Sequence, residues 1–412
     1  MGICSKNGRF TRVHHWERIM AKLSVKDLPI KGKKIFVRVD FNVPLDENLN
    51  VADDTRIRSS LPTITYILEQ GGIPVIASHL GRPKGEVNPK LSLAPVAKRL
   101  SELLHRKVIF AQDCIGDEVK RLAQGLKPGD ILLLENTRFH SEEKSNDPNF
   151  SQELASLADF YVNDAFGSAH RAHASVVGVA SQFKDPASGF LMENELRYLE
   201  GALHEPKRPL LAIIGGAKVS TKIGVIKNLL NGVDNLVIGG GMCFTFYKAK
   251  GYTIGKSLCE DDFLGEAGSL LGNPKIYLPV DVLIAREPKP GNPTRNVAAS
   301  AMPEDAYGVD IGEKSQQEIR ALIQEAKTIV WNGPMGIFEI DDFSKGTESI
   351  AHAIAQATTA GAVSIVGGGD TIAALRKLDL INQVSHASTG GGASLEYLEG
   401  KELPGVKILR DK

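Results

Sequence analysis

The chain has 412 residues, which is longer than a domain with a single hydrophobic core usually is. Of these residues 42% are hydrophobic and 24% charged, a composition typical of globular proteins. Lys and Arg number 49, as do Asp and Glu, so the formal net charge is zero and no whole-molecule field attracts nucleic acid or an anionic membrane. The four cysteines form no CxxC or metal-spaced pair, and no apolar run reaches the ~18–20 residues that span a bilayer, which favours a cytoplasmic protein of two domains.

Residues 1–19 differ from the rest of the chain. They carry four Lys or Arg, two His and one Glu without apolar periodicity. Lys6 breaks the pattern for N-myristoylation of Gly2, and the apolar core of a secretory signal is missing. We expect a disordered N-terminal extension or an upstream start codon; a targeting tail is the alternative.

Residues 20–187 alternate short apolar runs with helical patterns. Continuous apolar strands joined by helices are typical of a parallel sheet buried on both faces. We therefore predict a doubly wound α/β domain here. Its expected strands are Ile35–Asp40, Pro74–His79, Val108–Gln112, Ile131–Glu135 and Phe160–Asp164, and its helices include Ala94–Leu104 and Gln152–Ala158.

Residues 188–204 have the pattern of a helix. Leucine or glutamate recurs at every fourth position from Leu191 to Leu203, and Pro206 then stops the helix. Because the strand pattern restarts after residue 205, we expect this segment to be a hinge helix between two domains.

Residues 205–394 repeat the α/β pattern, and residues 395–412 lack a full unit. We expect the last segment to pack back on the N-terminal domain. The predicted fold class is therefore α/β, with two doubly wound parallel-sheet (Rossmann-like) domains joined by a hinge helix. The strands expected in the second domain are Leu210–Gly215, Leu236–Gly241, Lys275–Ala285, Ile329–Gly333, Val363–Gly368 and Gln383–Ser388.

Basic side chains gather at the expected strand ends of the first domain. In open parallel sheets ligands bind beyond the carboxyl ends of the strands. Guanidinium groups suit carboxylate and phosphate oxygens, so the pattern predicts a small, multiply anionic ligand. Solvated loop residues in surface ion pairs are the alternative. Nucleic acid is disfavoured because no aromatic residues are interleaved. The basic residues at these strand ends are Arg38, His79, Arg82, Arg138, His170 and Arg171; Arg56 lies on a loop-to-helix segment, and the polar Asp40 and Asn42 stand beside Arg38 at the first strand end.

Glycine occupies the corresponding strand ends of the second domain. Glycine turns let backbone N–H groups approach phosphate oxygens, although a lone turn often serves only helix–strand packing. Lys218 and Lys222, four residues apart, are expected to face the same side at the start of a helix. Asp370 next to a phosphate site favours a bridging Mg²⁺. The glycine-rich ends are Gly215–Lys218, Gly239–Gly241, Asn332–Gly336, Gly367–Thr371 and Gly390–Ser394.

Three other motifs are incomplete. The segment Gly251–Ser257 resembles a P-loop, but Lys250 stands where that motif needs glycine. No triple glycine completes GxGxxG, so the dinucleotide fingerprint of a nicotinamide-dependent dehydrogenase is absent. His170 and His173 have no partner with metal-ligand spacing, and we expect anion or packing contacts from them.

Long motifs follow one another in both halves, from about residue 20 to residue 409: RVDFNVP, SHLGRPKG, LLLENTRFH, NDAFGSAHRAHAS, GGAKVSTKIGVI, WNGPMGIFE, VGGGDTIAA and STGGGASLEYLEGKELPG. In sequence and order they resemble the motifs of the phosphoglycerate kinase family. That family implies a phosphotransferase with a carboxyl group as acceptor, which moves a phosphoryl group reversibly between 1,3-bisphosphoglycerate and ADP in glycolysis. The products are 3-phosphoglycerate and ATP.

The resemblance also implies roles for single residues. In the N-terminal domain, the residues that hold the phosphoglycerate would be Asp40, Asn42, Arg56, His79, Arg82, Arg138 and Arg171. In the C-terminal domain, those that bind the nucleotide would be Lys218, Lys222, Asn332, Glu339, Gly367, Gly368, Gly369, Asp370 and Thr371. Arg56 and Lys218 would be catalytic, and Asp370 would hold Mg²⁺ together with the nucleotide phosphates.

The residue types agree with such a mechanism. The leaving group of an acyl phosphate is a carboxylate, so no side chain has to move a proton, and catalysis would consist of positioning and charge stabilisation after domain closure. We expect a monomer with no nucleic-acid or membrane partner. A dehydrogenase and a non-catalytic nucleotide-binding protein are the competing classes; the first lacks its fingerprint, and the second has no need of the arginine cluster.

Overall fold

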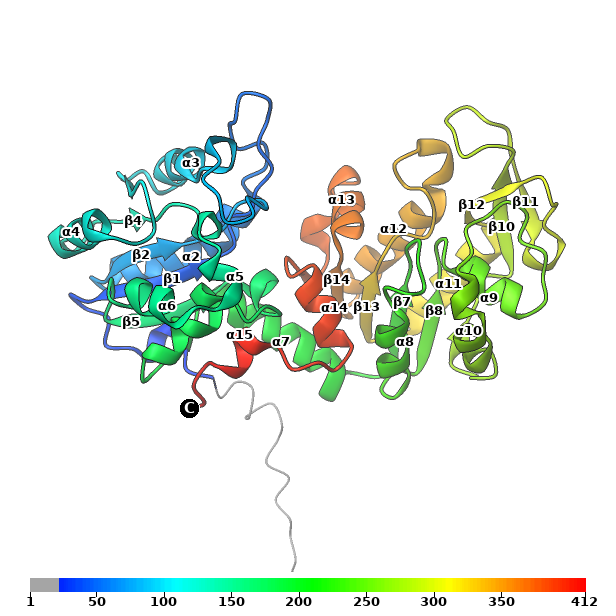
Figure 1. Cartoon of the computed structure of the whole chain (residues 1–412). Coiled ribbons are helices and arrows are strands. Elements are labelled where there is room, and N and C mark those ends of the chain that lie inside the picture. Colours follow the sequence, from blue (N-terminus) through cyan, green and yellow to red (C-terminus); the bar gives the residue numbers. More distant parts are fainter. Residues whose placement is uncertain (1–21) are drawn as a thin grey trace, which may run out of the picture.

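The computed structural model of the protein describes residues 22–412, so the expectations for residues 1–19 lie outside the described part of the chain. Two lobes stand side by side, and the long helix α7 (Phe190–His204) runs between them (Figure 1). Along residues 22–412 no helix is long and apolar enough to cross a bilayer.

Six strands form the sheet of the first lobe: β1 (Lys34–Val39), β2 (Ile73–Ala77), β3 (Ile109–Phe110), β4 (Leu132–Leu133), β5 (Phe160–Asp164) and β6 (Ala187–Ser188). All are parallel, in the order β3-β4-β2-β1-β5-β6. Its helices are α2 (Thr55–Glu69), α3 (Ala94–Leu104), α4 (Asp117–Gly125), α5 (Glu142–Ser145) and α6 (Pro148–Ala155).

Both faces of this sheet are covered by helices. On one face Ile35 and Val37 share a core with Ile57 of α2 and with α3, and on the other Phe36 shares a core with Phe150 of α6 and with α4. Side chains of neighbouring strand residues point to opposite faces, so a strand covered on both sides has no polar alternation. This explains the continuous apolar runs in the sequence.

The second lobe has a parallel sheet of the same size, made of β7 (Leu210–Ile214), β8 (Asn235–Ile238), β9 (Ile276–Tyr277), β13 (Thr328–Asn332), β14 (Val363–Gly367) and β15 (His386–Ala387). Their order is β15-β14-β13-β7-β8-β9. The helices of this lobe are α8 (Ile223–Leu230), α9 (Cys243–Ala249), α10 (Leu264–Leu270), α11 (Glu313–Glu325), α12 (Lys345–Thr359) and α13 (Gly369–Lys377). The prediction of two parallel-sheet α/β domains is confirmed.

The expected strand Lys275–Ala285 is wrong as a single element. The chain leaves the parallel sheet after Tyr277, Pro279 interrupts it, and β10 (Asp281–Ala285) begins a separate antiparallel sheet. Its partners are β11 (Thr294–Ala298) and β12 (Tyr307–Ile311). This small sheet lies at the far edge of the second lobe in Figure 1.

The expected helix Gln152–Ala158 begins and ends earlier, as α6. The carboxylate of Asp147 accepts a hydrogen bond from the N–H of Phe150, and Pro148 occupies the first helical position. A capping aspartate followed by proline is a strong helix start. The helix therefore begins at Pro148 rather than at the first periodic apolar residue.

The C-terminal segment returns to the first lobe. After α14 (Gly392–Leu398) and α15 (Pro404–Lys407), the carbonyl of Arg410 accepts from the N–H of Leu23 at 2.7 Å, and the N–H of Arg410 donates to Pro186 O at 2.9 Å. Gly405 N donates to Ala169 O at 2.8 Å. The chain thus crosses between the lobes twice, once through α7 and once on this return.

Candidate functional site

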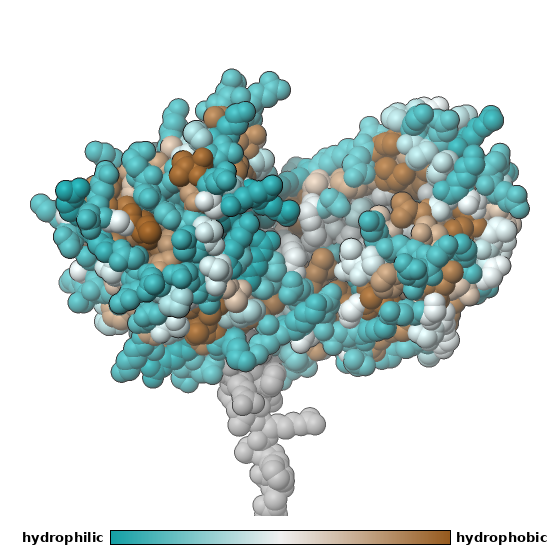
Figure 2. Space-filling view, viewed as in Figure 1, coloured by the Kyte–Doolittle hydropathy of each residue, from teal (hydrophilic) through white to brown (hydrophobic). Residues whose placement is uncertain are grey.

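The carboxyl ends of the strands in both lobes carry the polar residues predicted from the sequence. Figure 2 shows the surface hollowed between the lobes, with hydrophilic side chains along the first-lobe side of the hollow. Two cavities lie at these strand ends, one basic and one largely apolar.

The basic cavity has a volume of about 220 Å³. The structure brings together in it all seven residues predicted to hold the anion, with His170 and three glycines of the C-terminal segment. The glycines were expected at the edge of the second sheet, but the Gly390–Gly392 turn faces the first lobe, where Gly392 comes close to His170. The seven predicted residues are Asp40, Asn42, Arg56, His79, Arg82, Arg138 and Arg171.

Arg138 is the most confined cation of this cavity. Its side chain is 3% exposed, and Nη1 donates to Gly81 O at 2.8 Å. Neither Nε nor Nη2 has a hydrogen-bond partner among residues 22–412. Burial, with Arg38 and Arg171 nearby, lowers the pKa of the guanidinium to about 10, so it stays charged at neutral pH. A buried charge with unused donors is unfavourable unless an anion accepts from them.

Asp40 is the carboxylate that balances part of this charge. Arg56 Nη1 donates to its Oδ2, and Asn42 N donates to its Oδ1 at 3.2 Å. Burial alone would raise the pKa of Asp40, but positive charge on His79 when protonated, on Arg56 and on Arg38 lowers it to about 2. Asp40 is therefore ionised and holds Arg56 against the cavity.

The histidines of this region are neutral at physiological pH. Burial and the neighbouring arginines lower the pKa of His79, of His170 and, to about 3, of His173. His79 Nδ1 accepts a hydrogen bond from Arg38 Nη2, 3.2 Å away, because a guanidinium can only donate. These rings can therefore serve as hydrogen-bonding groups but add no charge to the site.

A buried network lies behind the cavity. It contains Arg38, which the sequence placed among the ligand-facing residues, and two residues that the sequence pattern did not indicate, Ser175 and Glu143. Arg38, fully buried, donates from Nε to Ser175 Oγ at 2.7 Å, and that hydroxyl donates to Glu143 Oε1 at 2.6 Å. The N–H of Ser175 donates to the other oxygen of Glu143 at 2.9 Å. Glu143 lies in the short helix α5, and Ser175 lies in the helical segment Ala174–Gly178, which is separated from β5 by another helical turn. Neither position directly follows the end of a strand, so the strand-end pattern could not find them.

The second cavity, of about 450 Å³, lies in the second lobe. Glycine turns form one wall, apolar and aromatic side chains from α9 and β12 form another, and the carboxylates of Glu339 and Asp370 lie at its border. Asp370 is exposed in the first turn of α13, where backbone N–H groups point outward. The lining includes Gly216, Ala217, Gly240, Gly241, Phe244, Leu258, Tyr307, Pro334 and Gly336.

The two lysines differ from the expectation. Both precede α8, Lys218 is exposed and Lys222 is buried, so the predicted shared helical face is wrong. Lys222 Nζ donates to Gly215 O (2.6 Å), Asn332 O (3.0 Å) and Asn332 Oδ1 (2.8 Å). Burial lowers its pKa to about 8. Lys222 thus ties the ends of β7 and β13 together, while Lys218 lines neither cavity.

The turns around Asn332 are built for close backbone approach. Gly333 has φ +100°, and a Cβ there would lie 2.5 Å from Lys222 Nζ. Gly333 N donates to Thr371 Oγ1 at 2.7 Å, which links β13 to α13. Asn332 Nδ2 is buried without a hydrogen-bond partner in the described chain, close to Gly367 and Gly368. The site therefore retains an unused amide donor beside the glycine turn.

Polar contacts join the two lobes on either side of the cleft. Arg376 of α13 donates to Asp53 of the first lobe at 2.9 Å. On the hinge side, the buried carboxylate of Glu195 in α7 accepts from Thr389 N at 2.7 Å and from Ser388 Oγ at 2.8 Å. The hinge helix is thus bonded directly to the segment that carries the Gly390–Gly392 turn.

Comparison with known proteins identifies the family. The family model described as phosphoglycerate kinase matches residues 25–401. The chain belongs to the phosphoglycerate kinase family. It is 54% identical over 391 residues to phosphoglycerate kinase 3, cytosolic, of Arabidopsis thaliana, covering 94% of this chain and 97% of that protein. It is 53% identical over 398 residues to phosphoglycerate kinase 2, chloroplastic, of the same plant, covering 95% and 83%.

A solved phosphoglycerate kinase shares the whole architecture. The structure from Coxiella burnetii superposes with a TM-score of 0.86 at 43% identity, covering 94% of this chain and 98% of that one. Membership of the phosphoglycerate kinase family makes the chain a kinase. Because relatives of near-equal identity have cytosolic and chloroplastic names, the similarity alone does not assign a compartment.

Proposed function

We propose that the protein transfers a phosphoryl group reversibly between 1,3-bisphosphoglycerate and ADP, giving 3-phosphoglycerate and ATP, with Mg²⁺ as cofactor. The observation that carries the proposal is the buried Arg138, in which two nitrogens, Nε and Nη2, have no hydrogen-bond partner within residues 22–412, in a cavity with Arg56, Arg82 and Arg171. A small ligand with a phosphate and a carboxyl group would satisfy these donors.

In the first lobe we assign the phosphoglycerate. Asp40 and Asn42 would contact the glycerate, and the remote phosphate would be held by His79, Arg82, Arg138 and Arg171. Asn42 Oδ1 already accepts from Gly81 N at 2.8 Å, so its NH₂ group remains to donate. Arg56, fixed by Asp40, would lie against the transferring group.

In the second lobe we assign the nucleotide. Glu339 would bind the ribose, and the phosphates would lie against Asn332 and the turn made by Gly367, Gly368, Gly369 and Thr371. The unused Asn332 Nδ2 donor supports this placement. Lys222 would also reach the phosphates, but its three N–H groups contact protein oxygens here, so it would have to exchange one of these bonds.

The residues present fit Mg²⁺. Asp370 offers an exposed carboxylate at the border of the second cavity, and a single carboxylate shared with substrate phosphates is the usual environment of this ion. When bound, Mg²⁺ would neutralise charge on the nucleotide phosphates.

The chain's own groups would act by position and charge. Transfer breaks the bond between the acyl oxygen and phosphorus and forms one to a β-phosphate oxygen of ADP, and the leaving carboxylate needs no proton. Arg56 from one lobe and Lys218 from the other would stabilise charge on the transferring oxygens once the lobes close. Closure would also exclude water, which hydrolyses acyl phosphates.

We further propose a cytosolic monomer with no nucleic-acid or membrane partner. The absence of an overall charge supports the lack of such partners. Two lobes that each carry half of the site give a complete active site within one chain.

A coupled assay tests the function. With 3-phosphoglycerate, ATP and Mg²⁺, and glyceraldehyde-3-phosphate dehydrogenase with NADH as the reporter, NADH should be consumed only when all three are present. Omission of each component in turn is the control. NADH consumption that does not depend on 3-phosphoglycerate would contradict the proposal.

A further inference from the structure

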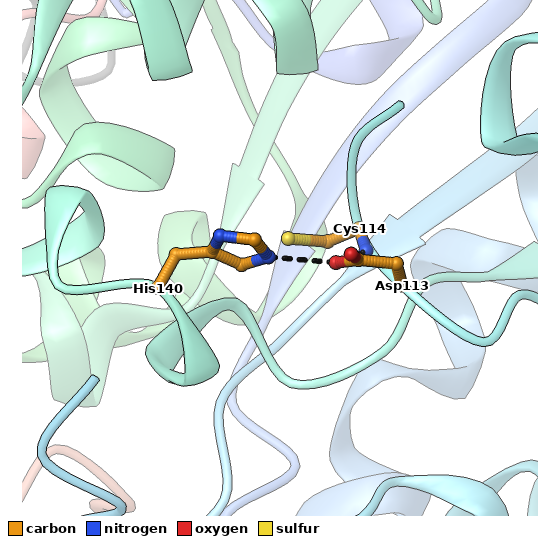
Figure 3. Close-up of side chains that lie close together, drawn as sticks. All are labelled: Asp113, Cys114 and His140. Carbon is orange, nitrogen blue, oxygen red and sulfur yellow. Dashed lines mark hydrogen bonds and ion pairs between the residues drawn. The ribbon is translucent and has the colours of Figure 1, made fainter. Parts of the chain in front are cut away.

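Away from the cleft, three side chains with metal-ligating atoms meet in the first lobe (Figure 3). Asp113 and Cys114 follow β3, and His140 follows the turn Thr137–Phe139. One ligand atom of each lies within 4.8 Å of the other two. His140 Nε2 is 2.7 Å from Asp113 Oδ1, and Figure 3 shows the sulfur of Cys114 turned toward the same ring.

The donor types select a class of ion. Thiolate and imidazole bind Zn²⁺ and its neighbours in the transition series, whereas Mg²⁺ takes oxygen ligands. At bond lengths of ~2.0–2.3 Å, ligand atoms of a tetrahedral zinc site lie about 3.4 Å apart. The His140–Asp113 pair would open slightly and the thiol would approach, both side-chain movements of about an ångström.

The backbone around the cluster holds the ligands in place. The carbonyl of Asp113 accepts from Glu135 N at 3.4 Å, and its carboxylate accepts from Cys114 N at 2.6 Å. Cys114 is fully buried and forms the inner side, while the side chains of Asp113 and His140 are 52% and 25% exposed. An ion can therefore enter from solvent and keep a water as its fourth ligand.

We propose that Asp113, Cys114 and His140 form a binding site for Zn²⁺ or a similar transition-metal ion, distinct from the Mg²⁺ site of the cleft. Binding releases the thiol proton to solvent. The imidazole proton moves from Nε2, where it is shared with Asp113, to Nδ1, so that Nε2 can coordinate. The ion joins the end of β3 to the turn that carries Arg138.

Co²⁺ is the probe for the test, because a tetrahedral site with a thiolate gives visible d–d absorption and a thiolate-to-cobalt band in the near ultraviolet. The full chain, stripped with a chelator and kept reduced with a phosphine, should bind one equivalent of Co²⁺ with both features. Zn²⁺ should then abolish them by displacement. Cys114→Ser should lose the near-ultraviolet band, and His140→Ala should weaken Co²⁺ binding at least tenfold.

The other thiols supply the controls. Cys259→Ser should keep the near-ultraviolet band. Cys4→Ser should keep it as well, and this variant tests whether Cys4, with His14 and His15, binds Co²⁺ at another site. If Cys114→Ser does not fold, His140→Ala and Asp113→Asn decide the matter. An ordinary His–Asp pair beside an inert thiol predicts no thiolate band. That result, or a band unchanged by the His140 and Asp113 substitutions, overturns the proposal.

Melting temperature gives a second readout that is independent of activity. A ligand that binds only the folded state raises stability, so Zn²⁺ at 100 times its dissociation constant should raise the melting temperature by several degrees. The shift should disappear in His140→Ala. An equal shift in the variant would place the bound ion elsewhere and contradict the assignment.

Discussion

Arg138 shows how a single residue can indicate its ligand. A guanidinium that is 3% exposed and bonded at only one nitrogen within the described residues is a poor structural element by itself. The network of Arg38, Ser175 and Glu143 balances charge behind it but leaves its donors free. A bound phosphate would accept hydrogen bonds from these donors, and this would offset the free-energy cost of burying the guanidinium.

Arg138→Ala should therefore weaken binding of the phosphoglycerate about 10- to 100-fold, since a charge-assisted contact to phosphate contributes ~1.5–3 kcal/mol. ADP affinity should hardly change, because the cavity proposed for ADP lies in the other lobe. Calorimetric titration with each ligand measures both. The exposed Arg121 of α4 is the control, and Arg121→Ala should bind both ligands normally. Equal weakening of both ligands by the Arg138 variant would contradict the division between lobes.

Lys218 tests the proposed transition-state role. It is exposed on the turn next to Gly216 and Ala217, which line the second cavity. Lys218→Ala should lower turnover by ~10²–10³-fold, the scale for removing one preorganised charge-stabilising donor, with far smaller changes in substrate affinity. Lys218→Arg should not restore the rate fully, because a planar fork replaces a point charge.

Rapid-quench kinetics distinguish this role from a surface one. Lys227, an exposed lysine paired with Glu266, is the control, and Lys227→Ala should turn over normally. If Lys218 is only a solvated residue of the turn, its alanine variant will turn over at a near-normal rate.

At the scale of elements, the first turn of the hinge helix α7 is hydrogen-bonded to a buried carboxyl group, that of Asp164. Asp164, the last residue of β5, accepts from Leu191 N at 2.9 Å in the first turn of α7. Burial raises the pKa of Asp164 to about 7, although bonds from Thr63 and the α7 amides lower it. The folded state therefore binds the proton more tightly than the unfolded state. The stability that this gives is present below about pH 4 and is lost as pH rises through about 7.

Asp164→Asn should remove this pH dependence, since the amide resembles the protonated acid. The variant and the wild type should melt at similar temperatures near pH 4, and the variant should be relatively more stable at pH 8. Melting curves at both pH values test this, with Asp305→Asn, an exposed acid, as the control. A constant difference between variant and wild type at every pH would show that Asp164 does not titrate as proposed.

The helices and strands also show which parts of the fold could be predicted from the sequence. The central strands β1, β2, β5, β7, β13 and β14 were predicted to within a residue or two, because burial on both faces gives continuous apolar runs. Strand β11 was missed since its residues are mostly exposed, with no alternation to detect. The orientation of Lys222 was predicted wrongly because its burial depends on the oxygens of Gly215 and Asn332. Asn332 is far from Lys222 in the sequence, and Gly215 is connected to it by an irregular turn. Contacts of that kind have no periodic pattern.

At the scale of the whole molecule, the parts of the site depend on both lobes. The Gly390–Gly392 turn faces the basic cavity, and the hydrogen bonds of Glu195 join the two residues before that turn, Ser388 and Thr389, to α7. A second polar contact between the lobes is the ion pair of Arg376 with Asp53. The closure that we propose would be a hinge movement about α7, and it would change the distance between these two side chains.

Residues 1–19 should be dispensable for activity and stability, because they lack apolar periodicity and precede the family match, which begins at residue 25. A chain that begins at Met20 should keep its turnover and its melting temperature within about a degree. Calorimetry and the coupled assay check the two. A loss of several degrees would mean that the extension packs on a lobe.

The central claim, transfer to a carboxyl oxygen, can be tested by identifying the product. In a single turnover with γ-labelled ATP, Mg²⁺ and 3-phosphoglycerate, the label should appear in an acyl phosphate. Hydroxylamine should convert that product to a hydroxamate and release the label as inorganic phosphate. Label in a product that resists hydroxylamine, or released as phosphate without 3-phosphoglycerate, would contradict the assigned reaction.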